Sequence, residues 1–366
     1  MGKSKVDRIF IFIAAVLVLV GIFIFTSASL GILAKNEQVF LSMVVNQLLI
    51  GLSGGFCAFF LFSKIPYRFW KKYALLIFIF SLTVTSLVFV PGIGLAHGGA
   101  TRWLDFGFLS FQPSELLKFA LVIYLAAWFS WFKDKANRSL YSVIPLFILL
   151  AVAAGIMLKQ PDTGTFMVMV VATLSIYFVS GAKWKHLFIF CLIGIVGLSV
   201  LVATRPYLKD RLVTFFDPTR DPRGSSYQIQ QSLLAIGSGE LFGRGLGQSV
   251  QKFSYLPEPV GDSVFAVIGE ELGFVGGTIT VLLFLIFGLR GLKIANRSPD
   301  FFSSYLVVGL TALIVSQSFL NIASLIGIFP LTGVPLAFIS HGGTALLFAM
   351  AEVGIIVNIS SYAGRT

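Results

Sequence analysis

Ten apolar stretches, each 15 to 27 residues long, constrain this chain more than any other feature of its sequence. A helix needs about 20 predominantly apolar residues to cross a bilayer, whereas a barrel strand needs only about 9 to 11 alternating ones. Charged residues make up 12% of the 366 residues, about half the share found in soluble domains. We therefore predict an all-α polytopic membrane protein with about ten transmembrane helices. The predicted spans are residues 9–30, 39–62, 73–95, 116–132, 140–158, 165–179, 187–203, 263–288, 301–327 and 345–362.

The distribution of basic residues predicts how the chain crosses the membrane. Most of the 27 lysines and arginines lie in alternate connections, such as 64–72 and 290–297, while the opposite short connections hold few. By the positive-inside rule, both termini and the basic connections are cytoplasmic. The first stretch resembles a signal peptide, but its 22 residues exceed the usual core of about 7 to 15, which favours an uncleaved span.

Two segments between the predicted spans are unusual. The longest connection, 204–262, separates the seventh and eighth spans, and apolar residues recur within it at helical spacing. We expect it to be extracytoplasmic. A segment rich in proline and glycine precedes the tenth span, and irregular backbone at membrane depth survives only where it lines a protein cavity. We expect a broken or re-entrant segment there, within a single membrane domain that comprises residues 1–366.

Several function classes are disfavoured. Cys57 and Cys191 lie inside apolar stretches, so we expect neither a disulfide framework nor a Cys/His metal site. The net charge of +11 is scattered over many connections instead of forming one stripe, which argues against nucleic-acid binding. The glycine-rich segment 237–247 lacks the Gly-Lys-Ser/Thr ending of a phosphate-binding P-loop, and we interpret it as a turn.

Charged residues beside the spans are candidates for chemistry, because a charge in lipid is costly unless it is paired or hydrated. Arg102 and Lys118 could hold an anionic headgroup such as a diphosphate. Pro113 can open a helix in which Glu115 and Lys118 share one face. An interfacial helix with one Glu–Lys ion pair explains the same residues equally well.

Carboxylates near the eighth span form a second group of candidates. Asp262 lies where the long connection meets this span, and it could be a general base with a raised pKa, a helix N-cap, or both. Asp162 is more simply interpreted as a cap of the sixth span. Glu270 and Glu271 follow Asp262 in an apolar run, so we expect at least one of them to pair inside the bundle, for example with Lys118 or Arg102.

Six motifs, in order and suitably spaced, resemble the SEDS family (shape, elongation, division and sporulation) of membrane-embedded peptidoglycan polymerases, which includes FtsW and RodA. They are GATRWLDFG, FQPSELLK, QPDTGT, YQIQQSLLAIGSGELFGRGLG, YLPEPVGDSVFAVIGEELG and PLTGVPLAFISHGG, and together they extend over almost the whole chain. The fifth motif is slightly more similar to FtsW.

The resemblance implies a function on the outer face of the bacterial cytoplasmic membrane. The family's activity joins lipid II, a disaccharide linked to undecaprenyl diphosphate, into β-1,4-linked glycan strands with inversion. By the same resemblance Asp262 is the catalytic base, the partner is a class B penicillin-binding protein, and a divalent cation (Mg²⁺ or Mn²⁺) could assist departure of the diphosphate. No nucleic acid is expected as a partner.

Further residues receive supporting assignments. Those assigned to substrate binding are Arg102, Trp103, Gln112, Glu115, Lys118, Gln160, Asp162, Gln228, Lys252 and Glu258. Those assigned to structural support are Glu270, Glu271, Pro330, Gly333, Ser340, Gly342 and Gly343. Two other functions use the same features: a flippase that transports the lipid-linked precursor without bond formation, and a scaffold that only binds a transpeptidase.

Overall fold

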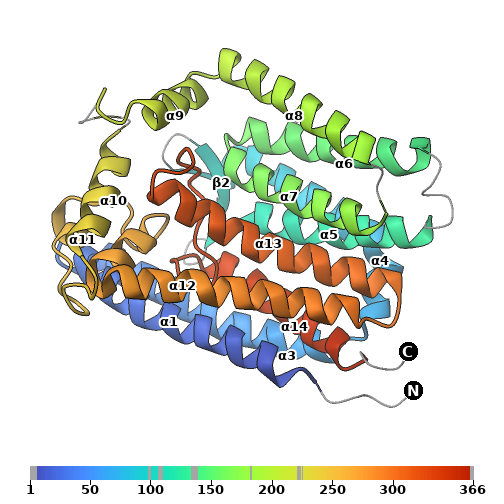
Figure 1. Cartoon of the computed structure of the whole chain (residues 1–366), viewed down its shortest axis with the longest axis horizontal. Coiled ribbons are helices and arrows are strands. Elements are labelled where there is room, and N and C mark those ends of the chain that lie inside the picture. Colours follow the sequence, from blue (N-terminus) through green and yellow to red (C-terminus); the bar gives the residue numbers. More distant parts are fainter. Residues whose placement is uncertain are drawn as a thin grey trace.

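The computed structural model describes residues 6–97, 100–105, 110–132, 139–181, 184–220, 224 and 226–362. This part of the chain is mostly helical, and its long helices lie side by side in a bundle (Figure 1). Each of the ten predicted stretches is helical over most of its length, although the last six residues of 73–95 form a turn and the start of a strand. In chain order these helices are α1 (Arg8–Leu33), the continuous α2, η1 and α3 (Glu37–Asn46, Gln47–Gly54, Gly55–Lys64), α4 with η2 (Tyr67–Ser86, Leu87–Phe89), α5 (Pro113–Trp131), α6 (Ser139–Lys159), α7 (Thr163–Val179), α8 (Trp184–Thr204), α12 (Val264–Asn296), α13 (Phe301–Leu325) and α14 (Gly343–Ser360).

The number of membrane spans is lower than expected when helices are judged by length and hydropathy. Seven helical segments of the described chain are long and apolar enough to cross a membrane. An eighth is obtained if α8 and α9 (Pro206–Phe216), which meet at a bend of 105°, form one broken span. The 17-residue α7 and the part of α6 from 146 to 159 are too short for this criterion. The integral membrane class is therefore confirmed, while the count of ten is not.

Side-chain caps define where several helices begin. The Asp7 carboxylate accepts a hydrogen bond from the Phe10 N–H at 2.9 Å, and Asn36 caps α2 in the same way. Asp300 and Ser303 form a reciprocal capping box at the start of α13. Pro113 is the first residue of α5, as its sequence context predicts.

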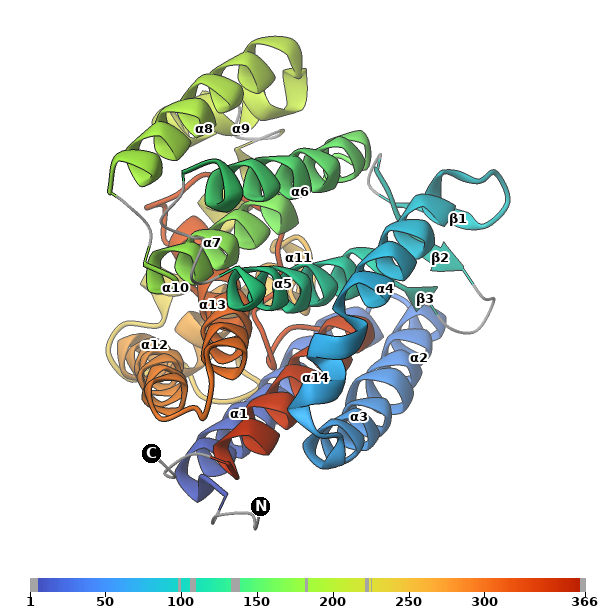
Figure 2. The same cartoon turned by 90° about the vertical axis from the view of Figure 1, so that its right-hand side faces the viewer.

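Helix α14 forms the centre of the bundle. In the end-on view it lies among α1, α3, α4, α5 and α13, and nearly all of its residues are buried (Figure 2). Its strongest packing is against α3, while α12 packs along α13. A buried polar side chain on α14 must find its partner within the protein, as Asn358 does by donating to the Ser63 carbonyl of α3 at 2.7 Å.

The two ends of the bundle differ in composition. Both termini lie at one end (Figure 1), where Arg290 pairs with Asp7 at 2.8 Å and the Tyr67 hydroxyl donates to Asp300 at 2.7 Å. The long connection contributes α9, α10 (Tyr227–Ser238) and α11 (Gln251–Ser254), and α10 and α11 lie at the other end. This separation agrees with the alternation of basic connections along the sequence.

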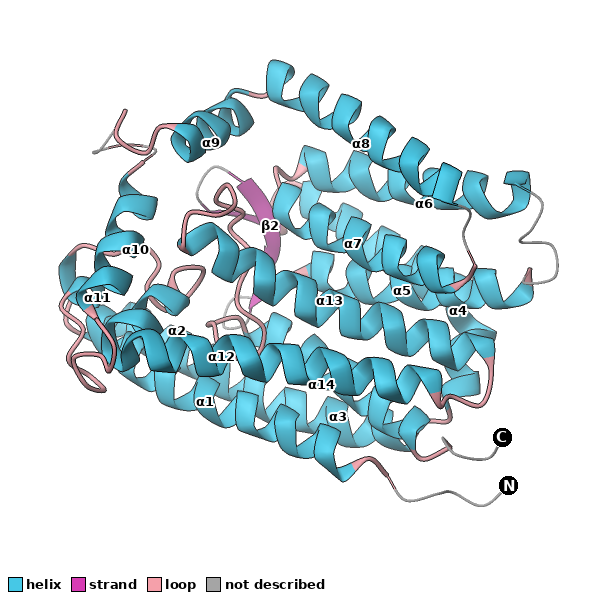
Figure 3. Cartoon of the chain, in the orientation of Figure 1, coloured by secondary structure: helices cyan, strands magenta, loops and turns pink. Residues whose placement is uncertain are grey.

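A small antiparallel sheet departs from the all-helical prediction. It has the order β1 (Gly94–His97), β2 (Ala100–Asp105) and β3 (Ser110–Phe111), shown in magenta in Figure 3. Arg102 therefore lies on a strand and not on a helix, whereas the Glu115–Lys118 ion pair of the alternative interpretation is present in α5. Such short strands carry little periodic signal, and they are stabilised by pairing with one another.

The segment between α13 and α14 is irregular, as predicted. Residues 330–336 have no regular secondary structure, yet Thr332, Val334 and Leu336 are buried. The proline- and glycine-rich sequence thus places non-helical backbone inside the protein, where side chains of neighbouring helices donate hydrogen bonds to the carbonyls of Thr332, Val334 and Pro335.

Candidate active site

Asp262 is held through the backbone of its own loop. The Asn321 side chain on α13 donates to the Asp262 carbonyl at 2.7 Å, and the Ser340 hydroxyl donates to the Gly261 carbonyl at 2.7 Å. The His341 N–H donates to the Val260 carbonyl at 2.6 Å. The N-cap of α12 is Ser263, so the interpretation of Asp262 as the cap is wrong. These bonds fix the position of Asp262 through main-chain carbonyls.

Arg211 of α9 lies near Asp262, beside Gly333. Gly333 has φ 68°, and a Cβ placed there would lie 3.5 Å from both the Arg211 Nη2 and the Asp262 Oδ2. The two atoms are therefore no further apart than twice that distance, but they form no ion pair within 4.0 Å. Arg211 Nη1 also donates to the Thr332 carbonyl at 3.1 Å. The base and the cation are therefore neighbours without a direct ion pair.

Arg102 reaches the same region from β2. Its Nε donates to the Gln160 carbonyl at 3.3 Å, and its Nη2 donates to the Pro161 carbonyl. Asp162 caps α7 by accepting from the Thr165 N–H at 3.3 Å, as interpreted from sequence. The first turn of α7 packs tightly against the irregular segment before α14. A Cβ on Gly164 would lie only 2.6 Å from the Thr332 carbonyl oxygen, so a larger residue would not fit there.

The charges of Glu258, Arg211 and Arg102 all affect the pKa of Asp262. Burial, followed by the negative charge of Glu258, raises the pKa of Asp262 above its ordinary value, while Arg211 and Arg102 partly oppose the shift. A carboxylate with a raised pKa is a better proton acceptor at neutral pH than an ordinary one. The site therefore combines a poised base with two cations.

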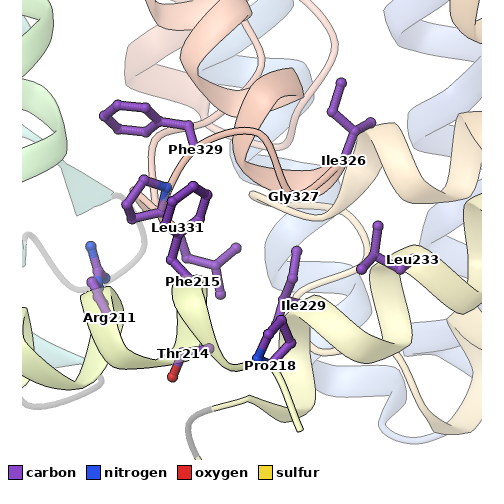
Figure 4. A pocket seen from close by; sticks show the side chains of 11 residues that line it. Arg211, Thr214, Phe215, Pro218, Ile229, Leu233, Ile326, Gly327, Phe329 and Leu331 are labelled. Atoms are coloured by element: carbon purple, nitrogen blue, oxygen red, sulfur yellow. The ribbon is translucent and has the colours of Figure 1, made fainter.

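An apolar cavity opens beside Arg211 (Figure 4). Its volume is about 150 Å³, and it lies between α9, α10 and the start of the irregular segment. Its lining residues are Arg211, Thr214, Phe215, Pro218, Ile229, Leu233, Ile326, Gly327, Phe329, Pro330 and Leu331. One cation beside an otherwise apolar wall suits an amphiphile with an anionic head.

The structure does not bring Lys118 to Asp262. Lys118 is 3% exposed, and its Nζ lies 2.8 Å from Glu115 Oε1 and 2.5 Å from Gln317 Oε1. The cation within electrostatic range of both Arg102 and Asp262 is Arg211 and not Lys118. Arg211 was not among the predicted site residues, because Lys209, Asp210 and Arg211 are adjacent charges in α9 and nothing in the sequence pattern distinguishes them.

Lys252 is also placed differently from its assignment to substrate binding. Its side chain is fully buried, and Nζ lies 2.6 Å from Glu271 Oε1 and 2.9 Å from the Ser27 hydroxyl. A buried and paired ammonium cannot contact a substrate, so Lys252 is a structural residue. It ties α11 to α1 and α12.

Glu270 and Glu271 pair inside the protein, but with neither Lys118 nor Arg102. Glu270 accepts from the Ser249 hydroxyl at 2.5 Å and from the Val250 N–H at 2.9 Å, while Glu271 pairs with Lys252. Two residues later Gly273, with φ 67°, interrupts the regular helix. The glycine-rich segment 237–247 crosses this break and replaces the lost bonds, for example from the Phe274 N–H to the Glu240 carbonyl at 2.8 Å.

The remaining assigned residues differ in burial and in hydrogen bonding. Trp103 is half-buried on β2, Glu258 is exposed, Pro330 lines the cavity and Gly343 begins α14. Three further residues make polar contacts: Gln112 through its N–H to the Thr344 hydroxyl (3.2 Å), Gln228 to the Ser263 hydroxyl (3.1 Å), and Gly342 through its N–H to Gln47 (3.1 Å).

Metal ligands are sparse in the described part of the chain, which contains no cluster of three or more His, Cys, Asp or Glu side chains. One carboxylate oxygen, Asp162 Oδ2, is buried and has no hydrogen-bond partner. Magnesium is commonly held by one or two carboxylates together with substrate phosphates. The residues therefore fit a cation that arrives with a diphosphate better than a cation held by protein ligands alone.

Fold and site together define a polytopic membrane protein with an acid–arginine site beside buried irregular backbone. The family model described as "Cell cycle protein", which covers FtsW, RodA and SpoVE, matches residues 7–364. The chain belongs to this FtsW/RodA/SpoVE family.

Individual relatives cover nearly the full length of the chain. It is 36% identical to stage V sporulation protein E of Bacillus subtilis (strain 168), over 98% of each chain. It is 34% identical to the probable peptidoglycan glycosyltransferase FtsW of Geobacter sp. (strain M18), over 97% of this chain and 96% of the relative.

Solved structures show the same fold. One chain, from work described as "Structural coordination of polymerization and crosslinking by a peptidoglycan synthase complex", is 26% identical and superposes with a TM-score of 0.78 over 99% of both chains. The rod shape determining protein RodA of Thermus thermophilus, 24% identical, superposes with a TM-score of 0.72, again over 99% of both chains.

Proposed function

We propose that this chain is a peptidoglycan glycosyltransferase that polymerises lipid II on the outer face of the bacterial cytoplasmic membrane. The observation that carries the proposal is that the Asp262 carboxylate and the Arg211 guanidinium lie close to the same point beside Gly333, with Arg102 within electrostatic reach. Family membership and the names of the relatives support the same activity.

The geometry supports an inverting displacement. Asp262 accepts the proton of the 4-hydroxyl of the acceptor sugar as that oxygen forms a bond to the anomeric carbon of the donor. The bond from this carbon to the diphosphate oxygen breaks, and its electron pair leaves with the diphosphate. Arg211 and Arg102 stabilise the negative charge that develops on the leaving group.

The cavity beside Arg211 is assigned to the first part of the donor's polyprenyl chain. Arg211 lies at its edge, so a diphosphate bound to this guanidinium would direct the attached chain into an apolar space. In this arrangement the donor binds on the side of Asp262 nearest α9. The acceptor must then reach Asp262 from a side that is not occupied by the donor.

Filling the cavity is expected to weaken donor binding. Leu233 lines the cavity, whereas Leu234 beside it is 58% exposed and does not. Leu233→Trp should raise the KM for lipid II about tenfold, since the larger ring takes the space of the chain, and Leu234→Trp should leave it within twofold. The KM is measured from initial polymerisation rates in detergent. Equal effects of the two substitutions would exclude the cavity as the chain subsite.

The pH dependence of polymerisation should respond to Glu258. Asp262 acts in its deprotonated form, so the rate falls as pH decreases through its pKa. The negative charge of Glu258 raises this pKa, and Glu258→Gln removes that charge. The acid limb of the pH–rate profile should therefore move to lower pH in the variant. A limb that stays in place or moves upward would contradict the assignment of that limb to Asp262.

A divalent cation, Mg²⁺ or Mn²⁺, is proposed to enter with the diphosphate and to be held by Asp162. The cation supplies positive charge to the diphosphate oxygens. Asp162→Asn keeps the oxygen that caps α7 but loses the charge. The variant should need a higher metal concentration for half-maximal rate; an unchanged metal dependence would remove Asp162 from this role.

A class B penicillin-binding protein is proposed as the partner of this chain, because a related chain comes from work on a peptidoglycan synthase complex. Co-purification from native membranes tests this pairing.

Both termini of the chain are proposed to be cytoplasmic. Labelling of single cysteines at either end in intact cells would test this orientation.

The activity itself is tested with purified protein and lipid II in detergent, where glycan strands should form. A flippase would instead move fluorescent lipid II across liposomes without forming polymer. A scaffold would show neither activity. Absence of polymer from folded protein, both alone and with its partner, would overturn the proposed function.

A further inference from the structure

A second charged cluster lies in the core of the bundle, separate from the site at Asp262. Glu115 and Lys118 of α5, Gln317 of α13 and Glu352 of α14 surround a cavity of about 10 Å³, enough for one water molecule. Each of these side chains belongs to a residue that is at most 5% exposed. The cluster is thus enclosed by helices that are expected to span the membrane.

The contacts within the cluster are unequal. Lys118 pairs with Glu115 at 2.8 Å and donates to Gln317 at 2.5 Å. Glu352 is 4% exposed, and among the described residues it has no ion pair or hydrogen bond, although both Lys118 and Glu115 act on it electrostatically. Two carboxylates therefore share the field of a single ammonium.

Charge balance decides the state of this cluster. If both carboxylates were ionised, the core would carry one uncompensated negative charge, which is costly in a medium of low dielectric. A neutral carboxylic acid avoids that cost. We propose that Glu352 holds a proton in the bundle core, so that Glu115, Lys118 and Glu352 form a neutral triad in which either carboxylate can serve as the counter-ion of Lys118.

The triad is connected to the active-site backbone. Gln317, which accepts from Lys118, donates through Nε2 to the Pro335 carbonyl at 3.0 Å. Pro335 lies between Gly333, which faces Asp262, and Ser340, which holds the loop of Asp262. Lys118 and Glu352 are therefore positioning residues for the irregular segment. Their effect on turnover rests on the proposed function, whereas the stored proton does not.

Removal of the carboxylates singly and together tests the proposal. Glu352→Gln and Glu115→Gln should each lower the thermal unfolding midpoint of the detergent-solubilised protein by only a few degrees, because the other carboxylate balances Lys118. The double substitution leaves a buried ammonium without a counter-ion and should lower the midpoint by on the order of 10 °C. Adding Lys118→Met to the double variant should restore most of the loss.

Infrared difference spectra detect the proton directly. The carbonyl band of a protonated carboxylic acid should be present in the wild-type protein and absent in Glu352→Gln. It should also be absent in Glu115→Gln, in which Glu352 ionises to balance Lys118, and it should be stronger in Lys118→Met, in which both acids are neutral.

Turnover provides a readout that a purely structural role would not affect. Glu352→Gln should polymerise lipid II with a kcat within threefold of wild type. The double variant, assayed below its unfolding midpoint, should lose more than tenfold in kcat, which is more than the product of the losses in Glu352→Gln and Glu115→Gln, with KM little changed. Additive losses in the double variant, or an unchanged carbonyl band in Glu352→Gln, would overturn the triad. Wild-type protein without polymerase activity would instead overturn the proposed function and leave the spectroscopic result standing.

Discussion

Replacing Asp262 with asparagine is expected to lower the rate of glycan polymerisation by about 10²–10⁴-fold, the usual contribution of a positioned general base. Asparagine has nearly the same shape, so the bonds from Asn321 and Ser340 to the backbone of this loop remain possible. The loss should appear in kcat, because the proton is transferred in the transition state. The measurement is the initial rate of lipid II consumption, together with gel analysis of the glycan strands.

Asp210→Asn is the matched control for this substitution. Asp210 is an exposed carboxylate in α9, within the same long connection as Asp262. It is adjacent in sequence to Arg211, so the control also tests whether a charge change near the site is enough to alter the rate. Loss of one negative charge from this connection should by itself leave the polymerisation rate within twofold. A polymer yield from Asp262→Asn equal to that of the control would remove Asp262 from its role as base.

Replacing Arg211 with methionine is expected to reduce kcat/KM by about 10²–10³-fold, as removal of one group that stabilises a developing charge commonly does. Methionine keeps much of the apolar stem beside the cavity and removes the guanidinium that faces Asp262. Arg211→Lys should recover only part of the loss, since an ammonium cannot hold the Thr332 carbonyl and a phosphate with the same fork geometry.

Lys209→Met is the control for the charge of α9. Lys209 is exposed and lines a different surface hollow, so its substitution removes the same net charge without entering the site. Inhibition by undecaprenyl diphosphate, the proposed leaving group, should weaken in Arg211→Met and not in Lys209→Met. If both variants lose activity equally, α9 contributes only a general positive potential.

Of the two arginines near Asp262, only Arg102 could be predicted from a sequence motif. Arg102 lies in a segment of unusual charge between spans and was assigned to the site, and the structure places it within electrostatic reach of Asp262. Arg211 belongs to a helix whose neighbouring residues are also charged, so its importance depends on the bend between α8 and α9 that directs it toward Gly333. No local pattern contains that bend.

The hydropathy pattern and the basic connections were sufficient for the membrane class, the positions of the ten helical stretches and the irregular segment before α14. These features depend on local composition, because each span must satisfy its own backbone and cover about 30 Å of hydrocarbon. The cap at Asp162 and the start of α5 at Pro113 were likewise predictable, since the first residues of a helix act on that helix alone. The motif that contains Asp262 also pointed to the candidate base.

The partners of the buried charges were decided only by tertiary packing. Lys118, Lys252 and Glu271 are equally conspicuous in the sequence, but their counter-ions come from the docking of particular segments against particular helices. Lys252 meets Glu271 because the Gly273 break and the glycine-rich turn bring α11 against α12. A charge in an apolar bundle must find a partner, yet the energy that requires the pairing does not specify which residue supplies it.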